Sequence, residues 1–266
     1  MFRRLRERWH LLLVAVLALC LVAGVSAGVY LSTPYPDRAG VAAVEADPAI
    51  AVSPSEAGWV MRPANASSSV ALVFYPGARV SPESYLPVLA PLVAERNVTV
   101  VVPSMPLNLA VLDADAADEV VEAHPAVDRW AVGGHSLGGA MACRYAAERG
   151  ERDERVEGLV LLGAYCDVDV STADLAVVSV VGERDTVVDR GNYRRGLARL
   201  PEDAIVAEPA GVNHSQLGSY TGQSGDAPGT VSYERAHERV AAALLAWYDA
   251  AFTPSGAASR VAARPA

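Results

Sequence analysis

A serine between closely spaced glycines is the first feature of the sequence that indicates chemistry. Residues 134–138 read Gly-His-Ser-Leu-Gly and match the pattern Gly-x-Ser-x-Gly, in which a sharp strand-to-helix turn raises the serine above a sheet. Glycines are needed because the turn is strained and the strand and helix crowd together. An apolar run, 130–132, precedes the motif and small residues follow it. We therefore expect Ser136 to be a nucleophile.

A serine hydroxyl is a weak nucleophile near neutral pH, so it needs a histidine base and a carboxylate that orients the histidine. In a setting of this kind the chain order is serine, acid, histidine, and the acid and the histidine lie on loops after later strands. Asp185 follows the apolar run 176–181, and His214 follows the run 204–207. We predict that these two residues complete a catalytic triad.

Other acids and histidines fit these roles less well. Glu183 and Asp189 flank Asp185 on the same expected loop and remain competing acids. His10 lies in the apolar N-terminal region, and His124 precedes the serine. His135 stands beside the serine on a turn that should point its ring away. His237 lies inside the last expected helix.

The intermediate of acyl transfer carries an oxyanion, which two backbone N–H groups stabilise. The amide of Leu137, directly after the nucleophile, is one expected donor. The second should come from the turn after the run 70–75, which reads Pro76-Gly77-Ala78. Because proline has no N–H, we expect Ala78 to donate, with Gly77 as the alternative.

The rest of the body alternates apolar runs with helical patterns. Strands that are apolar throughout and separated by helices indicate a mostly parallel sheet, here of about six to seven strands, with helices on both faces. Only residues 163–175 separate two of the strands, too few for a helical cap domain, so we expect an open, shallow site. The expected strands are 58–62, 70–75, 98–102, 130–132, 158–162, 176–181 and 204–207, and the expected helices are 85–96, 116–123, 138–149, 192–200 and 234–252.

The N-terminal segment has the pattern of a transmembrane helix. Four arginines within residues 1–10 precede the uncharged run 11–31, which is long enough to cross the roughly 30 Å hydrocarbon core of a bilayer. Positive charge favours a cytoplasmic N-terminus, so we expect a single-pass anchor with the remaining chain outside the cytoplasm. The alternative is a signal peptide cleaved near residues 25–27, which would release a secreted protein. After the span we expect a linker over 32–57, a catalytic domain over 58–252 and a disordered tail over 253–266.

Composition excludes several classes of protein. The 266 residues carry a formal net charge of −9, and all 22 basic residues are Arg, an acidic balance that argues against nucleic-acid binding. Three cysteines provide neither a disulfide scaffold nor a Cys-x-x-Cys metal site. Cys143 and Cys166 could approach each other near the serine turn, but we expect two buried free thiols. We expect no metal and no organic cofactor. The sequence does not indicate an oligomeric state.

Taken together, several stretches resemble the α/β-hydrolase superfamily. The resemblance is strongest to a small bacterial and archaeal group of serine hydrolases without a lid, which combine a Tyr-Pro-Gly oxyanion turn with a Gly-His-Ser-Leu-Gly-Gly elbow. It covers roughly residues 58–250 and implies an α/β-hydrolase fold with Ser136, Asp185 and His214 as the triad. The stretches that carry it are 74–77, 105–111, 134–140, 182–185 and 213–218.

These observations lead us to expect a serine hydrolase that cleaves small carboxylic esters, such as short acyl esters, lactones or thioesters, through an acyl-enzyme. One alternative is a hydrolase fold without catalysis that serves as a binding module. Another is an acyltransferase or perhydrolase, in which the same triad passes the acyl group to an alcohol, a thiol or peroxide.

Overall fold

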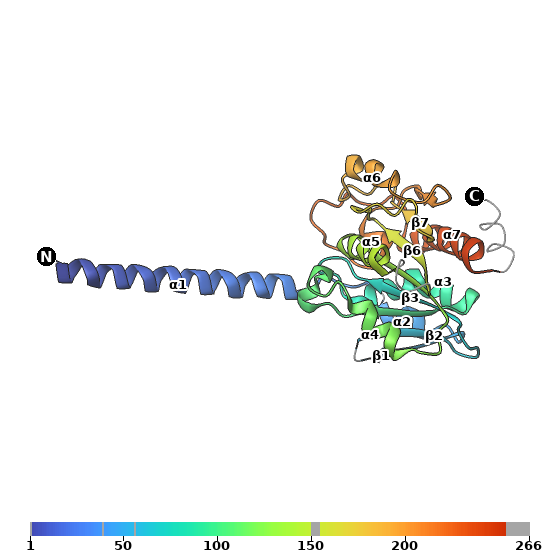
Figure 1. Ribbon diagram of the computed structural model, residues 1–266, viewed down its shortest axis with the longest axis horizontal. Helices are drawn as coiled ribbons and strands as arrows, with labels where there is room; N and C mark the ends of the chain where they lie inside the picture. The colour runs from blue at the N-terminus through green and yellow to red at the C-terminus, as the bar shows by residue number, and fades with distance from the viewer. Residues whose placement is uncertain (1, 39, 56, 150–154, 254–266) are drawn as a thin grey trace.

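The strands form one mixed sheet in the order β1-β2-β4-β3-β5-β6-β7-β8 (Figure 1). The computed structural model describes residues 2–38, 40–55, 57–149 and 155–253. Strands β3 to β8 run parallel to one another, whereas β2 pairs antiparallel with both β1 and β4. The bounds are β1 Ile50–Ser55, β2 Gly58–Pro63, β3 Val70–Tyr75, β4 Thr99–Pro103, β5 Arg129–His135, β6 Val156–Leu162, β7 Ala176–Val180 and β8 Ile205–Ala207.

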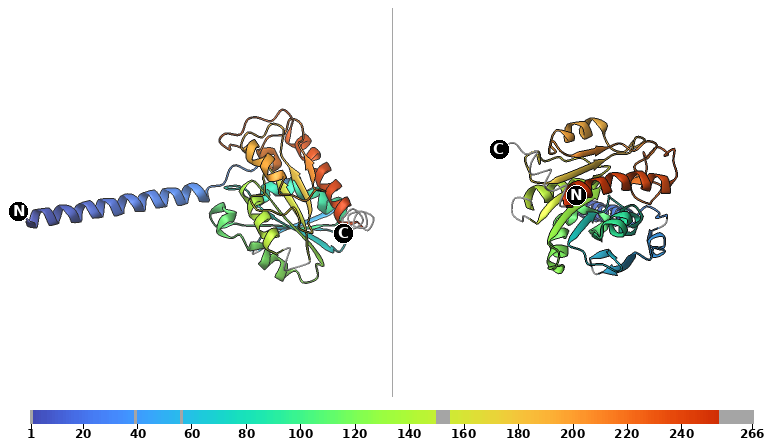
Figure 2. Two further views of the ribbon diagram at one scale, coloured as in Figure 1. Left: turned by 45° about the horizontal axis from the view of Figure 1, so that its top comes forward. Right: turned by 90° about the vertical axis from the view of Figure 1, so that its right-hand side faces the viewer.

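Helices cover both faces of this sheet, as the apolar strands predict (Figure 2). On one face α2, α3 and α7 pack against the strands, and on the other α4 and α5 do so, which gives two separate hydrophobic clusters. Strands β3, β4 and β7 are buried along their whole length, so their sequences show no alternation of polar and apolar residues. The bounds are α2 Gly40–Glu45, α3 Leu86–Arg96, α4 Ala116–Ala123, α5 Leu137–Arg149, α6 Arg190–Leu197 and α7 Tyr233–Phe252.

The expected linker over 32–57 is the main difference from the sequence analysis. It contains α2, whose Val44 is buried in the core. It also contains β1, which pairs with β2 at the edge and brings the number of strands in the sheet to eight. Because β1 lies at the edge, most of its side chains are solvent-exposed. Its composition therefore resembles that of a loop.

A single long helix, α1 (Phe2–Ser32), projects from the body (Figure 1). Its stretch Leu13–Ser32 is long and apolar enough to cross a membrane, and none of it is buried against the protein. At the other end of the chain, the expected tail lies outside the described residues from 254 onwards. Between β6 and β7, where the sequence predicts no cap, residues 163–175 contain neither a helix nor a strand.

The prediction of two free thiols is wrong, because Cys143 and Cys166 form a disulfide. Cys143 lies in the second turn of α5, and Cys166 lies on the loop that follows β6. Since α5 packs against β6, the two Cα atoms are only 5.6 Å apart, a separation typical of disulfides. The sequence spacing of 23 residues does not reveal this contact.

Replacing both cysteines in a Cys143→Ala/Cys166→Ala variant is expected to lower the free energy of unfolding by about 3 kcal/mol, because the disulfide closes a loop of moderate length. Thermal unfolding with and without a reductant measures the effect. The reductant should lower the Tm of the unaltered protein toward that of the variant and leave the variant's Tm unchanged. Equal Tm values for the two oxidised proteins would contradict this prediction.

Candidate active site

Ser136 is the single residue between the end of β5 and the start of α5. Its φ of 52° lies in the left-handed region, which is strained for a residue other than glycine. The turn is tight because α5 approaches the chain after β3. A Cβ at Gly138 would lie 2.2 Å from the carbonyl oxygen of Tyr75 and 2.3 Å from that of Pro76. This explains the glycine of the motif and places the Tyr-Pro-Gly turn beside the serine.

The two turns that meet here supply the expected oxyanion donors. The N–H of Gly77 donates to the hydroxyl of Tyr85 at 2.9 Å, so it is not free and Gly77 drops out as a donor. Leu137 and Ala78 are both partly exposed. Among the residues that the structure describes, neither of their N–H groups has a hydrogen-bond acceptor. These two amides remain the candidate pair.

Tyr85 also contacts His135, the residue before the serine. Because the Tyr85 hydroxyl accepts from Gly77, its hydrogen is free to be donated to Nδ1 of His135, 2.9 Å away. Burial is the main cause that places the pKa of His135 well below its usual value, and the neighbouring His214 lowers it further, so this imidazole is neutral. The His135 ring lies between Tyr85 and His214, with ring centroids 5.6 and 4.3 Å away. Nothing in the sequence pointed to Tyr85.

Asp185 and His214 form the central pair of the site. Nδ1 of His214 lies 2.7 Å from Oδ2 of Asp185, and both side chains are completely buried. Oδ1 of Asp185 accepts the backbone N–H groups of Val187 and Val188 at 2.9 and 3.0 Å. Burial raises the pKa of the Asp185 carboxyl, but His214 and the two amides together bring it below its usual value. Ionised Asp185 therefore stabilises the fold above a pH of about 3.9, and this contribution is lost as the pH falls through the lowered pKa.

The loop that carries His214 is held by side-chain hydrogen bonds on both sides of the histidine. Asn213 and Gln216 each accept the other's backbone N–H through a side-chain oxygen, at 3.1 Å in both directions. The carboxylate of Asp226 accepts the N–H groups of His214 and Ser215 and the hydroxyl of Ser215. Asn-His-x-Gln is therefore a structural motif that fixes the backbone of the histidine. No pattern in the sequence indicated Asp226.

Ser136 and His214 both adjoin the carboxyl end of β6. The N–H of Ser136 donates to the carbonyl of Leu162 at 3.0 Å, and a Cβ on the next residue, Gly163, would lie 3.0 Å from two atoms of the His214 ring. Nε2 of His214 is buried and has no hydrogen-bond partner among the described residues, so it makes no hydrogen bond to the Ser136 hydroxyl. In unliganded active sites such bonds are often long and shorten only with substrate.

The two competing acids have other partners. Glu183 accepts the N–H of Gly211 at 2.7 Å, and Asp189 caps α6 by accepting the N–H of Asn192 at 2.6 Å. Neither carboxylate is hydrogen-bonded to an imidazole. Of the three acids that the sequence left open, the structure therefore brings only Asp185 to His214.

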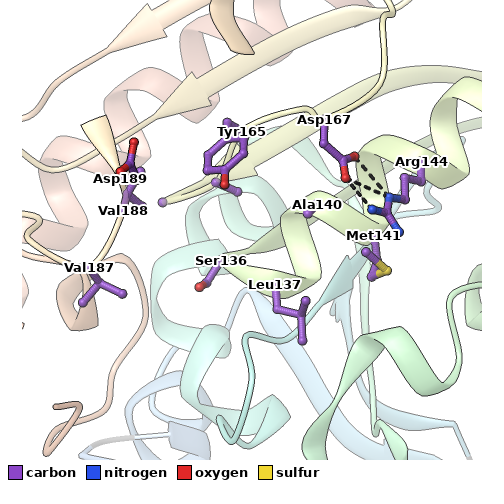
Figure 3. A pocket seen from close by; sticks show the side chains of 12 residues that line it. Ser136, Leu137, Ala140, Met141, Arg144, Tyr165, Asp167, Val187, Val188 and Asp189 are labelled. Carbon is purple, nitrogen blue, oxygen red and sulfur yellow. Dashed lines mark hydrogen bonds and ion pairs between the residues drawn. The ribbon is translucent and has the colours of Figure 1, made fainter. Parts of the chain in front are cut away.

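Ser136 borders a pocket of about 410 Å³ (Figure 3). Its walls are α5, the loop after β6 and the loop after β7, and an ion pair between Arg144 and Asp167 lies at one end. No group of three or more His, Cys, Asp or Glu side chains within the described ranges could hold a metal ion. The lining residues are Ser136, Leu137, Ala140, Met141, Arg144, Gly163, Ala164, Tyr165, Asp167, Val187, Val188 and Asp189.

Comparison with known proteins gives a family and a fold. Residues 71–238 match the description "Alpha/beta hydrolase family". The esterase domain of a Rhodothermus marinus protein superimposes with a TM-score of 0.54 at 16% identity, over 75% of this chain and 97% of that one. A candidate lipase from Acinetobacter baumannii AYE gives 0.53 at 14% identity, over 75% and 92%. No curated protein matches the sequence.

Proposed function

The chain belongs to the alpha/beta hydrolase family, and we propose that it is a serine hydrolase that cleaves small carboxylic esters. The observation that carries this proposal is the buried Asp185–His214 pair, whose Nε2 has no described partner, at the same end of β6 as the strained turn of Ser136. A base oriented by a carboxylate beside a serine is the arrangement that activates a hydroxyl. The name of the Rhodothermus marinus relative, an esterase domain, agrees with it.

In the proposed reaction, the Ser136 hydroxyl attacks the carbonyl carbon of the ester while His214 Nε2 takes its proton. The buried carboxylate of Asp185 holds the ring and stabilises the imidazolium that forms. The N–H groups of Leu137 and Ala78 bind the oxyanion of the tetrahedral intermediate. Its collapse gives an acyl-enzyme and an alcohol that takes the proton from His214. Water then attacks the acyl-enzyme with His214 again as the base, and Ser136 is regenerated.

The pocket supports substrates with a small acyl group. Its volume of about 410 Å³ lies at the lower end of the range for small-molecule sites. Leu137, Met141, Val187 and Val188 give it apolar walls. Because residues 163–175 form no cap over the pocket, we propose short acyl esters, lactones or thioesters as the substrate class.

We also propose that α1 anchors the enzyme in a membrane with its N-terminus in the cytoplasm and the catalytic domain outside. The arginines before the span favour this orientation. The disulfide between Cys143 and Cys166 agrees with it, since disulfides persist in oxidising compartments outside the cytoplasm. A signal peptide cleaved near residues 25–27 would give the same compartment without the anchor.

A fluorophosphonate probe tests the proposal directly, because it reacts only with an activated serine. We expect the folded protein to be labelled on Ser136, as identified by peptide mass spectrometry, and expect prior unfolding to abolish the labelling. The exposed Ser104 serves as the internal control and should stay unlabelled. Absence of labelling at Ser136 in folded protein would favour a binding module without catalysis.

A further inference from the structure

Three exposed apolar side chains cluster on the loop after β4. Leu107, Val111 and Leu112 are 45%, 50% and 53% exposed. They lie on two short 3-10 helices, η2 (Pro106–Asn108) and η3 (Ala110–Leu112). Among the described residues outside α1, the only other large hydrophobic side chain with comparable exposure is Val206 on β8. We call Leu107, Val111 and Leu112 the η2–η3 patch.

The patch is fastened to the last turn of α1. Nδ2 of Asn108 donates to the carbonyl of Leu31 at 3.2 Å. The guanidinium of Arg79 donates twice to the carbonyl of Thr33, at 3.1 and 3.2 Å, and lies 3.8 Å from the ring centroid of Tyr30. The backbone N–H of Arg79 in turn donates to the carbonyl of Asn108 at 2.9 Å. Figure 1 shows α1 meeting the body at this end.

These contacts fix the depth of the patch relative to a membrane. The apolar stretch Leu13–Ser32 is 20 residues long, which matches the roughly 30 Å hydrocarbon core. Tyr30 and Leu31 therefore lie at its outer boundary, where tyrosine side chains are enriched. We propose that the η2–η3 patch contacts the surface of the bilayer in which α1 is anchored. This inference rests on the anchor and the ester hydrolysis proposed above.

The contact is apolar rather than electrostatic. Asp113 and Asp115 follow the patch directly, and Arg79, the basic residue of this cluster, is already bound to α1. Negative charge would oppose binding to anionic lipid. A zwitterionic phosphatidylcholine bilayer is therefore the appropriate partner, and the contact should be insensitive to salt.

The patch lies beside the candidate active site. Its η3 helix packs against α5, whose first turns form one wall of the pocket. Arg79 directly follows Ala78, the proposed second oxyanion donor. With the patch on the bilayer, the site lies next to the lipid headgroups. The substrates best placed to reach it are esters that partition into the membrane.

Fluorescence quenching tests the contact with the full-length protein in phosphatidylcholine vesicles that contain nitroxide-labelled lipid. An environment-sensitive fluorophore is attached to Val111→Cys or, as the matched control, to Val206→Cys, each combined with Cys20→Ala. The label at 111 should be quenched about twofold, as expected for a side chain in the headgroup region, and the label at 206 should be unaffected. Equal quenching at the two positions overturns the proposal.

A label on the native Cys20, within α1, reports whether the anchor is inserted. Strong quenching there is expected. Its absence would overturn the anchor and, with it, the contact of the patch. Neither quenching measurement depends on catalysis. A protein that contacts the bilayer but hydrolyses no ester would therefore contradict the proposed function and not the contact.

Activity provides the second readout. A Val111→Glu/Leu112→Glu variant should lose about tenfold in the hydrolysis of dodecyl acetate, a short acyl ester held in the vesicles by its long alcohol, because charge opposes contact with the interface. It should hydrolyse soluble p-nitrophenyl acetate as the unaltered protein does. Val206→Glu should change neither rate. Equal loss on both esters would contradict a role at the membrane, and no hydrolysis of either ester by the unaltered protein would contradict the proposed function.

Discussion

Ser136→Ala is expected to lower the turnover of p-nitrophenyl acetate by about 10⁴-fold or more, because loss of the nucleophile removes the covalent route and leaves only binding and the oxyanion donors. The fold should be preserved, since the backbone N–H of Ser136, not its hydroxyl, bonds to Leu162. Alanine at a φ of 52° is strained to a similar extent as serine. Measuring kcat/KM together with the Tm separates loss of catalysis from loss of folding.

The matched control is Ser104→Ala, at an exposed serine after β4 whose hydroxyl has no described partner. It should keep full activity. A Ser136→Ala protein that retained most of the turnover while folded would exclude the proposed nucleophile. Any remaining hydrolysis would then have to come from another group in the pocket.

The second large effect is expected for Asp185→Asn, with a drop in kcat of about 10⁴-fold through the wrong imidazole tautomer. The carboxylate of Asp185 accepts a hydrogen from Nδ1 of His214, which leaves Nε2 without a proton and free to act as the base. An amide NH₂ group in the same place donates to Nδ1 instead and puts the proton on Nε2. The oxygen of the introduced amide can still accept from Val187 and Val188, so the loop should stay folded. A profile of kcat against pH and the Tm measure both effects.

Glu183→Gln is the control for this substitution, since Glu183 lies two residues away and bonds to the N–H of Gly211. An uncharged glutamine can keep that bond, so activity should change little. If Glu183→Gln proves the more damaging substitution, Asp185 is not the acid that orients His214.

The parts of the fold that follow from local patterns could be predicted. Apolar, β-branched runs give the parallel strands, and α4 spans the residues expected for a helix, 116–123. The candidate site was predictable for a related reason. Parallel strands bring their carboxyl ends to one edge, so Asp185 and His214 could be placed together from their positions after two strands, although 29 residues separate them.

What the sequence did not reveal depends on contacts between distant segments. The edge strand β1 has no apolar pattern because only Ile50 is buried in it. Tyr85 and Asp226 act through hydrogen bonds to residues 8 to 50 positions away in the sequence, and side chains of both types are common on helices and loops. The disulfide likewise depends on how α5 packs against β6, which no spacing of cysteines encodes.

The contacts of Arg79 with Tyr30 and of Asn108 with Leu31, which hold the end of α1 against the body, have a practical consequence for soluble forms of the enzyme. A truncation that removed everything up to residue 31 would delete the Tyr30 ring and the Leu31 carbonyl, and so leave the loop that adjoins Ala78 held only by the contacts of Arg79 with Thr33 and Tyr35. Processing near residues 25–27 would leave both groups on the mature chain. A shortened protein intended for kinetics should therefore begin no later than Gly28.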